Sequence, residues 1–223
     1  MDFEALWLTL RLAVGTTAIL LVVSLPLAWW IATGRGGGRA LVQAVVALPL
    51  VLPPTVLGFY LLVALGPLSA PGRLLTRMLG HPLAFSFAGL LVGSVIYSLP
   101  FAVQPLVSGF AAVDRAYVEA AEGLGASPWR TFWSVMLPLT RASLLTSAVL
   151  TFTHTVGEFG VVLMLGGNIP GATQTLSIAL YDRVQEFDYA AANRTALVLV
   201  AVSLAALLLI YSRRGGLRRG ELV

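Results

Sequence analysis

The sequence predicts an all-α membrane protein with five or six transmembrane helices. Of its 223 residues, 58% are hydrophobic and 11% are charged, which leaves too little charge to cover a water-soluble surface. Uncharged segments recur along the chain, and several reach the roughly 20 residues that an α-helix needs to cross a bilayer. The arginines are concentrated in short stretches beside these segments, which is typical of residues that set membrane orientation.

Three predicted spans occupy the first half of the chain. Residues 12–32 are uncharged. The chain begins with the acidic Asp2 and Glu4, and Arg35 and Arg39 come after the segment, so we expect a retained span and not a cleaved signal peptide. Residues 40–66 form the second span, which prolines interrupt near its middle. Residues 67–82 are rich in Pro and Gly and are predicted to be an external loop, and the third span covers residues 83–109.

Two further spans are predicted in the second half of the chain, at residues 142–165 and 195–212. Residues 173–192 carry several charges, so we expect an external or partly re-entrant helical segment there and not a complete crossing. The predicted membrane domain therefore covers residues 6–212, and residues 213–223 form a basic cytoplasmic tail.

The distribution of arginine predicts the orientation of these spans. The chain contains 14 basic residues, and all of them are arginine. With the N-terminus outside and the C-terminus in the cytoplasm, nine arginines lie on the cytoplasmic side and five on or near the outer side. This excess agrees with the positive-inside rule, so we expect a multi-pass protein of the inner or plasma membrane.

Composition and motifs argue against several classes of function. Because the chain has no lysine, it cannot form a P-loop, whose lysine contacts the nucleotide phosphates. It has no cysteine, and it lacks HExxH, GxSxG and acidic calcium-loop motifs. His154 and Glu158 are one helical turn apart, but no third metal ligand accompanies them. We therefore predict no enzymatic activity, no metal or cofactor bound by this chain, and no nucleic-acid partner.

Four residues within the predicted spans are candidates for a transport pathway or gate: Pro53, Pro54, Thr55 and Glu158. The prolines break the helical hydrogen bonding, and in lipid such breaks are tolerated where they face protein or a water-filled path. A static kink that only shapes packing is the alternative. Glu158 is the only acidic residue deep in an apolar segment, so it is expected to face protein or water. His154, on the same helix face, is expected to be a packing residue.

Residues 110–138 are amphipathic rather than uniformly apolar, and they predict two short helices joined at an angle. Asp114 can cap the first helix, and Gly125 can end it. Ser127 followed by proline can begin the second helix, and Pro138 disfavours helix at the residue before it.

The two predicted helices carry different faces. On the first, Ala116, Ala120 and Gly123 follow one another at helical spacing, so this face can lie close against another surface. On the second, aromatic side chains including Trp129 and Trp133 share a face, which suits a helix in the membrane interface.

The spacing in this segment resembles the EAA loop of the permease subunits of binding-protein-dependent ABC importers. The matching residues are Glu119, Ala120, Ala121, Gly125, Val135, Leu137 and Pro138. Valine takes the place of the usual isoleucine. Two flanking stretches, residues 48–58 upstream and residues 157–160 with 166–171 downstream, make the chain most similar to permeases for molybdate, with the sulfate and thiosulfate permeases as the next nearest group.

This resemblance implies a type I ABC importer permease fold in which the EAA loop is the cytoplasmic coupling helix. It implies a homodimer, two separate ATPase subunits that bind ATP and Mg, and an external oxyanion-binding protein that delivers molybdate or tungstate. It also implies ATPase-coupling roles for six residues: Glu119, Ala120, Ala121, Gly123, Gly125 and Pro138.

Several alternatives remain open from the sequence. One is a permease of the sulfate and thiosulfate type, because no residue reports which tetrahedral anion is carried. Another is a passive channel or a secondary transporter in which Glu158 carries the coupling proton. A third is that residues 110–138 are only a cytoplasmic hairpin. The complete EAA spacing favours the ABC permease, since a channel has no use for that loop.

Overall fold

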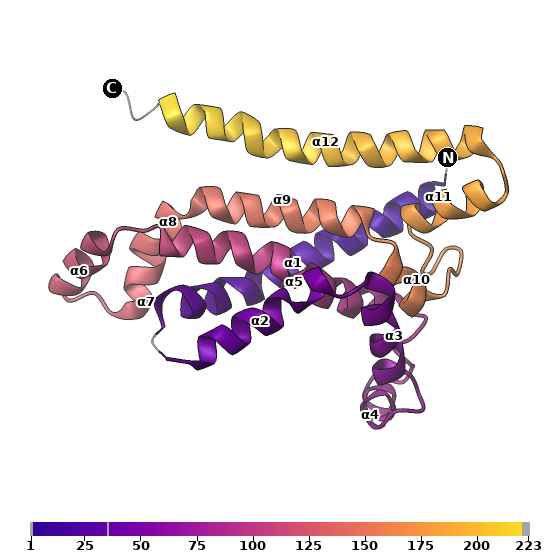
Figure 1. Ribbon diagram of the computed structural model, residues 1–223, viewed down its shortest axis with the longest axis horizontal. Coiled ribbons are helices and arrows are strands. Elements are labelled where there is room, and N and C mark those ends of the chain that lie inside the picture. Colours follow the sequence, from indigo (N-terminus) through magenta and orange to yellow (C-terminus); the bar gives the residue numbers. More distant parts are fainter. Residues whose placement is uncertain (1, 35, 220–223) are drawn as a thin grey trace.

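The protein is described by a computed structural model covering residues 2–34 and 36–219, and these residues are helical with no β-strand, as predicted. The long helices run along the longest axis of the molecule (Figure 1). In order, the elements are α1 (Phe3–Thr33), α2 (Gly38–Val51), α3 (Pro54–Leu65), α4 (Ala70–Leu79), α5 (Phe87–Ala111), α6 (Arg115–Gly123), α7 (Pro128–Thr131), the π-helical turn η1 (Phe132–Met136), α8 (Leu137–Leu139), α9 (Arg141–Gly157), α10 (Gly160–Gly166), α11 (Leu176–Gln185) and α12 (Tyr189–Arg219).

Three helices in the described part of the chain are each long and apolar enough to cross a membrane: α1, α5 and the 189–209 part of α12. Two further pairs of helices are bent at a short break. The α2–α3 pair is bent by 111°, and the segment 128–139 is bent by 74° relative to α9. The described residues therefore contain three to five candidate spans, and five are reached when each bent pair is counted as one.

α1 is longer than the predicted first span at residues 12–32. It begins at Phe3 because the Asp2 carboxylate caps it, accepting a hydrogen bond from the Ala5 N–H at 3.2 Å. The helix continues through Arg11, whose guanidinium lies 4.9 Å from the centre of the Phe87 ring. The helix therefore includes Arg11, which lies outside the predicted uncharged span at residues 12–32.

The predicted second span at residues 40–66 is not one helix. α2 ends at Val51, and α3 starts again at Pro54, so the break falls on the prolines as predicted. The predicted loop at residues 67–82 is wrong in part, because most of it forms α4. The Ser69 hydroxyl caps this helix by accepting a hydrogen bond from the Gly72 N–H at 2.8 Å. Gly80, in the left-handed conformation, ends it.

The predicted fourth span at residues 142–165 is also broken. α9 ends at Gly157 and α10 begins at Gly160, so Glu158 lies at a break and not within a continuous helix. The expected helical segment at residues 173–192 is present as α11. It turns into α12, which begins at Tyr189, six residues before the predicted start of the last span.

α1 passes through the centre of the packing. Its buried residues recur at a spacing of three or four, which places them on one helix face against α5 and α9: Leu8, Leu12, Thr16, Leu20, Ser24, Ala28 and Ile31. One core cluster joins Ala28 to Val103, Phe110 and Phe132 near the end of the molecule that carries α6. A second joins Leu12 to Val162 and Ile178 towards the other end.

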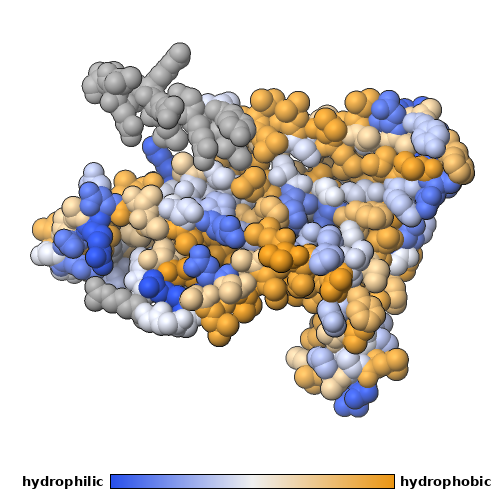
Figure 2. Space-filling view, in the orientation of Figure 1, coloured by the Kyte–Doolittle hydropathy of each residue, from blue (hydrophilic) through white to orange (hydrophobic). Residues whose placement is uncertain are grey.

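Apolar side chains cover much of the visible face between the two ends of the molecule (Figure 2). Hydrophilic side chains gather near α6 at one end and near the turn between α11 and α12 at the other. Large residues such as Trp7, Val22 and Leu204 are more than half exposed. Exposed apolar area on this scale indicates a surface that faces lipid or another subunit.

Candidate functional site

The predicted coupling segment begins with a short capped helix. The Asp114 carboxylate accepts a hydrogen bond from the Ala116 N–H at 3.0 Å and caps α6. At the other end the Ala126 N–H donates to the Ala121 carbonyl at 3.0 Å, and the Gly125 N–H donates to the Glu122 carbonyl at 2.9 Å. This pair of bonds is a Schellman motif, and Gly125 has the positive φ, +80°, that the motif requires. Both helix-end predictions are confirmed.

The second half of the segment starts where the sequence predicts. The Ser127 hydroxyl accepts a hydrogen bond from the Arg130 N–H at 3.3 Å, and proline occupies the first position of α7. The prediction that Pro138 disfavours helix at Leu137 is wrong. A π-helical turn shifts the hydrogen bonding, so that the Leu137 N–H donates to the Phe132 carbonyl and helix continues through Leu139. The bend comes instead at Thr140, before α9.

The π-helical turn anchors the coupling segment in the core. Phe132 and Met136 are buried, and the Phe132 ring lies 4.9 Å from the Trp29 ring of α1 and 5.9 Å from the Phe110 ring of α5. Trp129 is stacked on Phe132 but remains 63% exposed. The aromatic face predicted from the sequence therefore divides into a buried part, which fixes the segment to the membrane helices, and an exposed part.

The predicted contact face of α6 is open. α6 contains no buried residue, and Ala116, Ala120 and Gly123 are all exposed. A Cβ atom added to Gly123 would meet no heavy atom within 4 Å. This face is therefore free to receive another protein.

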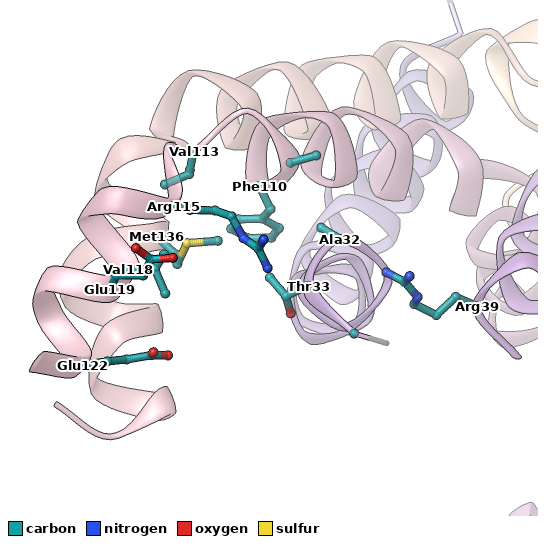
Figure 3. Close-up of a pocket in the computed structure, with 12 residues that line it drawn as sticks. Ala32, Thr33, Arg39, Phe110, Val113, Arg115, Val118, Glu119, Glu122 and Met136 are labelled. Carbon is teal, nitrogen blue, oxygen red and sulfur yellow. The ribbon is translucent and has the colours of Figure 1, made fainter. Parts of the chain in front are cut away.

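A cavity of about 620 Å³ separates α6 from the end of α1 and the start of α2 (Figure 3). Charged residues of both signs line it: Arg39, Arg115, Glu119 and Glu122. None of these four residues forms an ion pair. Among the described residues, the only ion pair joins Arg183 to Glu186. Glu119 and Glu122 therefore keep their charges available for a partner or for another arrangement of this segment.

The two groups of predicted pathway residues come together at the crossing of α3 and α10. Pro54 packs on Gly160, where an added Cβ atom would lie 2.7 Å from the Pro54 Cβ. One turn further on, a Cβ atom on Gly58 would lie 2.8 Å from the Met164 Cβ and 3.1 Å from the Val161 Cα. The two short helices can approach this closely only because each contributes a glycine.

Glu158 joins three helices at this crossing. The residue is 4% exposed, and Oε1 accepts hydrogen bonds from the N–H groups of Val161 at 2.8 Å and Val162 at 3.2 Å, in the first turn of α10. The Ser94 hydroxyl of α5 donates to Oε2 at 3.3 Å. Glu158 therefore faces protein, as predicted, and it supplies acceptors for N–H groups that the break leaves without helical partners.

His154 is a packing residue, as expected. Its ring stacks on Phe101 with the ring centres 3.9 Å apart, and Tyr97 lies against it at 4.8 Å. Nδ1 lies 2.9 Å from the Ser98 hydroxyl, which is also 3.0 Å from the Thr155 hydroxyl. His154 and Glu158 thus have separate partners, and the described residues contain no group of three potential ligands that could hold a metal ion.

Sequence reasoning missed the residues that support these sites. Ser94, Ser98 and Gly58 give only the general signal of small residues in an apolar helix, and the partners of the two serines are more than 50 positions away. Phe132 belongs to the aromatic face predicted for the second short helix, but its contacts with α1 and α5 could not be inferred from spacing.

The architecture, the capped coupling segment and the broken helices define an importer permease. A family model described as "Binding-protein-dependent transport system inner membrane component" matches residues 24–214, and the chain belongs to this family. The crystal structure of a bacterial ABC transporter that imports alginate matches with a TM-score of 0.77 at 20% identity, covering 95% of this chain and 79% of that one. The MetNI methionine ABC transporter in inward-facing conformations matches with a TM-score of 0.74 at 18% identity, covering 95% and 94%. These two likenesses support the fold.

Other relatives are more similar to this chain in sequence than these two structures, and they are permeases for molybdenum or sulfate. The molybdenum transport system permease protein ModB of Azotobacter vinelandii is 52% identical over 214 residues, which cover 96% of this chain and 94% of that protein. ModB of Escherichia coli K12 is 33% identical, covering 91% of both chains. The sulfate transport system permease protein CysT of the same strain is 35% identical, but the match covers 86% of this chain and 68% of CysT.

A first prediction concerns the capping role of Glu158. In Glu158→Gln the amide oxygen can still accept from Val161 and Val162, whereas Glu158→Ala leaves these N–H groups and the Ser94 hydroxyl unpaired. Each unpaired buried group costs about 1–3 kcal/mol. We expect Glu158→Ala to lower the thermal unfolding midpoint of the purified protein in detergent, and Glu158→Gln to stay close to wild type. An equal loss in both variants would mean that the charge matters and not the hydrogen bonding.

A second prediction concerns the anchor at Phe132. Phe132→Ala removes a buried ring and should destabilise the packing of η1 on α1 and α5 by about 3–5 kcal/mol. The exposed Trp129→Ala is the matched control, since its ring is not part of the core. Limited proteolysis should cut near residues 126–140 faster in Phe132→Ala than in Trp129→Ala. Equal cleavage rates would show that Phe132 does not hold the segment.

Proposed function

We propose that this chain is the membrane subunit of an ATP-driven importer that takes up molybdate or tungstate from an external binding protein. The observation that carries this proposal is the 52% identity with the A. vinelandii ModB protein over nearly the whole of both chains. A sulfate or thiosulfate permease is the second candidate, since CysT proteins also match, but over a smaller share of their length. Selectivity between these anions is assigned mainly to the binding protein.

In this proposal the chain does not hydrolyse ATP. Two separate ATPase subunits bind ATP and Mg and contact the coupling segment. The residues proposed to carry the contact are Glu119, Ala120, Ala121, Gly123, Gly125 and Pro138. The open face of α6 and the positive φ of Gly125 support this assignment, because one permits close approach and the other fixes the direction of the segment that follows.

We further propose that two copies of the chain form the transport pathway. Many large apolar side chains of one copy are exposed, among them Trp7, Val22 and Leu204, and a second copy can cover part of this surface. A two-fold pair places the same broken helices on both sides of a path and presents two coupling segments to two ATPases.

The proposed orientation places the N-terminus outside and the C-terminus in the cytoplasm. The start of α1 and the end of α12 lie towards opposite ends of the long axis, the start of α1 beside α11 and the end of α12 towards the end that carries α6 (Figure 1). This separation agrees with an odd number of crossings. The same orientation puts the coupling segment on the cytoplasmic side, where ATP is available.

The test of this function is uptake of labelled molybdate by vesicles that contain the permease, its ATPase and the loaded binding protein. We expect uptake that needs ATP and resists an excess of sulfate. Uptake driven by a proton gradient without ATP would favour the secondary transporter, and uptake that sulfate abolishes would favour the sulfate permease. Omission of the ATPase is the control.

A further prediction tests the coupling face. Ala120→Trp adds a ring to the open face of α6, and Gly125→Leu forces a branched side chain into a left-handed conformation at a cost of about 1–3 kcal/mol. We expect both variants to reach the membrane but to bind the ATPase weakly and to lose most of the uptake. Gly37→Leu is the control, because Gly37 lies in the turn before α2, has a φ of −71° and has open space around it. Wild-type ATPase binding and uptake in both test variants would contradict the coupling role.

A further inference from the structure

A second cavity, of about 510 Å³, lies at the crossing of the broken helices. Four elements line it: Thr55 comes from α3, Tyr97 from α5, Thr153 and His154 from α9, and Gly160 from α10. Pathway candidates from both parts of the sequence line this cavity: Pro54 and Thr55 from the first break, and Glu158 from the second. Its size is within the range of small-ligand sites, and it is ample for a tetrahedral oxyanion.

The cavity should contain water or face a second subunit. Hydroxyl groups and interrupted backbone that faced hydrocarbon would lack hydrogen-bond partners, and each such group costs several kcal/mol. Thr55 is exposed at the cavity, beside the two prolines of the α2–α3 break. A position against lipid is therefore strongly disfavoured for this surface.

The polar groups of the cavity divide into those that are already bonded and those that are not. The Thr153 hydroxyl donates to the Val149 carbonyl at 2.8 Å, and the oxygens of Glu158 accept three hydrogen bonds from the protein. His154 is held at Nδ1 by Ser98. The hydroxyl groups of Thr55 and Tyr97 have no hydrogen-bond partner among the described residues, so two donors from two different helices remain available.

We propose that this cavity is a subsite that binds a tetrahedral oxyanion during its passage, with the Thr55 and Tyr97 hydroxyls donating to the anion oxygens. The inference rests on the proposed function and names the residues of this chain that contact the anion. No arginine lines the cavity. Neutral donors bind a dianion weakly, and a pathway needs weak binding because the anion must also leave.

The capping of Glu158 makes such a subsite compatible with a nearby carboxylate. Its carboxylate accepts hydrogen bonds from two backbone N–H groups and from the Ser94 hydroxyl, and only 4% of the residue is exposed. The carboxylate therefore contributes little surface to the cavity. The hydroxyls of Thr55 and Tyr97, in contrast, make no hydrogen bond within the described residues.

Protection of a single cysteine tests binding directly. The chain has no cysteine, so Thr55→Cys introduces its only thiol. In the assembled complex we expect a water-soluble thiol reagent to modify this position, and millimolar molybdate or sulfate to slow the reaction at least about twofold, whereas chloride at equal ionic strength has no effect. Tyr60→Cys, on α3 but outside the cavity and 63% exposed, is the control that no anion should protect. Equal rates with and without oxyanion at Thr55→Cys would overturn the subsite.

Tyr97→Phe tests the role of the hydroxyl in transport. The ring that packs on His154 is retained, and one donor is lost, which should reduce molybdate uptake about two- to tenfold. ATP hydrolysis stimulated by the loaded binding protein should stay within about twofold of wild type, because the hydroxyl holds no other residue in place. Tyr60→Phe is the matched control. An unchanged uptake, or a parallel loss of uptake and ATP hydrolysis, would contradict the subsite.

The two measurements separate this inference from the proposed function. If wild-type vesicles take up no molybdate with ATP, the proposed function is wrong, but the cysteine protection still decides whether the cavity binds oxyanions. If uptake is normal and no protection occurs, the proposed function stands and the subsite is rejected.

Discussion

The structure depends on how it satisfies backbone groups where helices break inside an apolar environment. Glu158 provides the acceptors for the first turn of α10, and the Ser177 hydroxyl of α11 donates to the Val156 carbonyl at the end of α9 at 3.2 Å. At the other break, Pro53 and Pro54 have no N–H groups, so fewer donors need partners. These local solutions allow α3 and α10 to be short helices in an apolar environment, where unpaired backbone groups are otherwise costly.

The same breaks connect the two ends of the molecule. α9 is one uninterrupted helix of 17 residues, about 25 Å long, between the bend at Thr140 and the break at Glu158. The π-helical turn leads into it from the coupling segment, and Phe132 fixes that turn to α1 and α5. A displacement of this segment would therefore act on a rigid helix whose other end contributes Thr153 and His154 to the lining of the second cavity. A rigid helix between two hinges transmits motion without needing a chain of separate contacts.

The sequence was informative where structure is determined locally. The caps at Asp114 and Ser127 and the stop at Gly125 use partners two to five residues away, so their spacing was enough to predict them. The helix α4 carried the same kind of signal at Ser69, but its many Pro and Gly residues were interpreted as a loop. The contact between Glu158 and Ser94 joins residues 64 positions apart, and no local pattern reports it. Pro138 was expected to disfavour helix at the residue before it. A π-helical turn avoids this effect, and such a turn cannot be recognised from one sequence.

α6 and η1 differ in how firmly they are packed against the rest of the chain. α6 has no buried residue and touches the rest of the chain mainly through α7 and η1, so its own position costs little to change. η1 is buried by Phe132 and Met136, so it moves only together with the helices around it. Arg39, Arg115, Glu119 and Glu122, which form no ion pair among the described residues, line the cavity between α6 and the neighbouring ends of α1 and α2. A force applied to α6 therefore reaches the membrane helices through η1, and any change in the distances between these charged side chains changes their electrostatic energy.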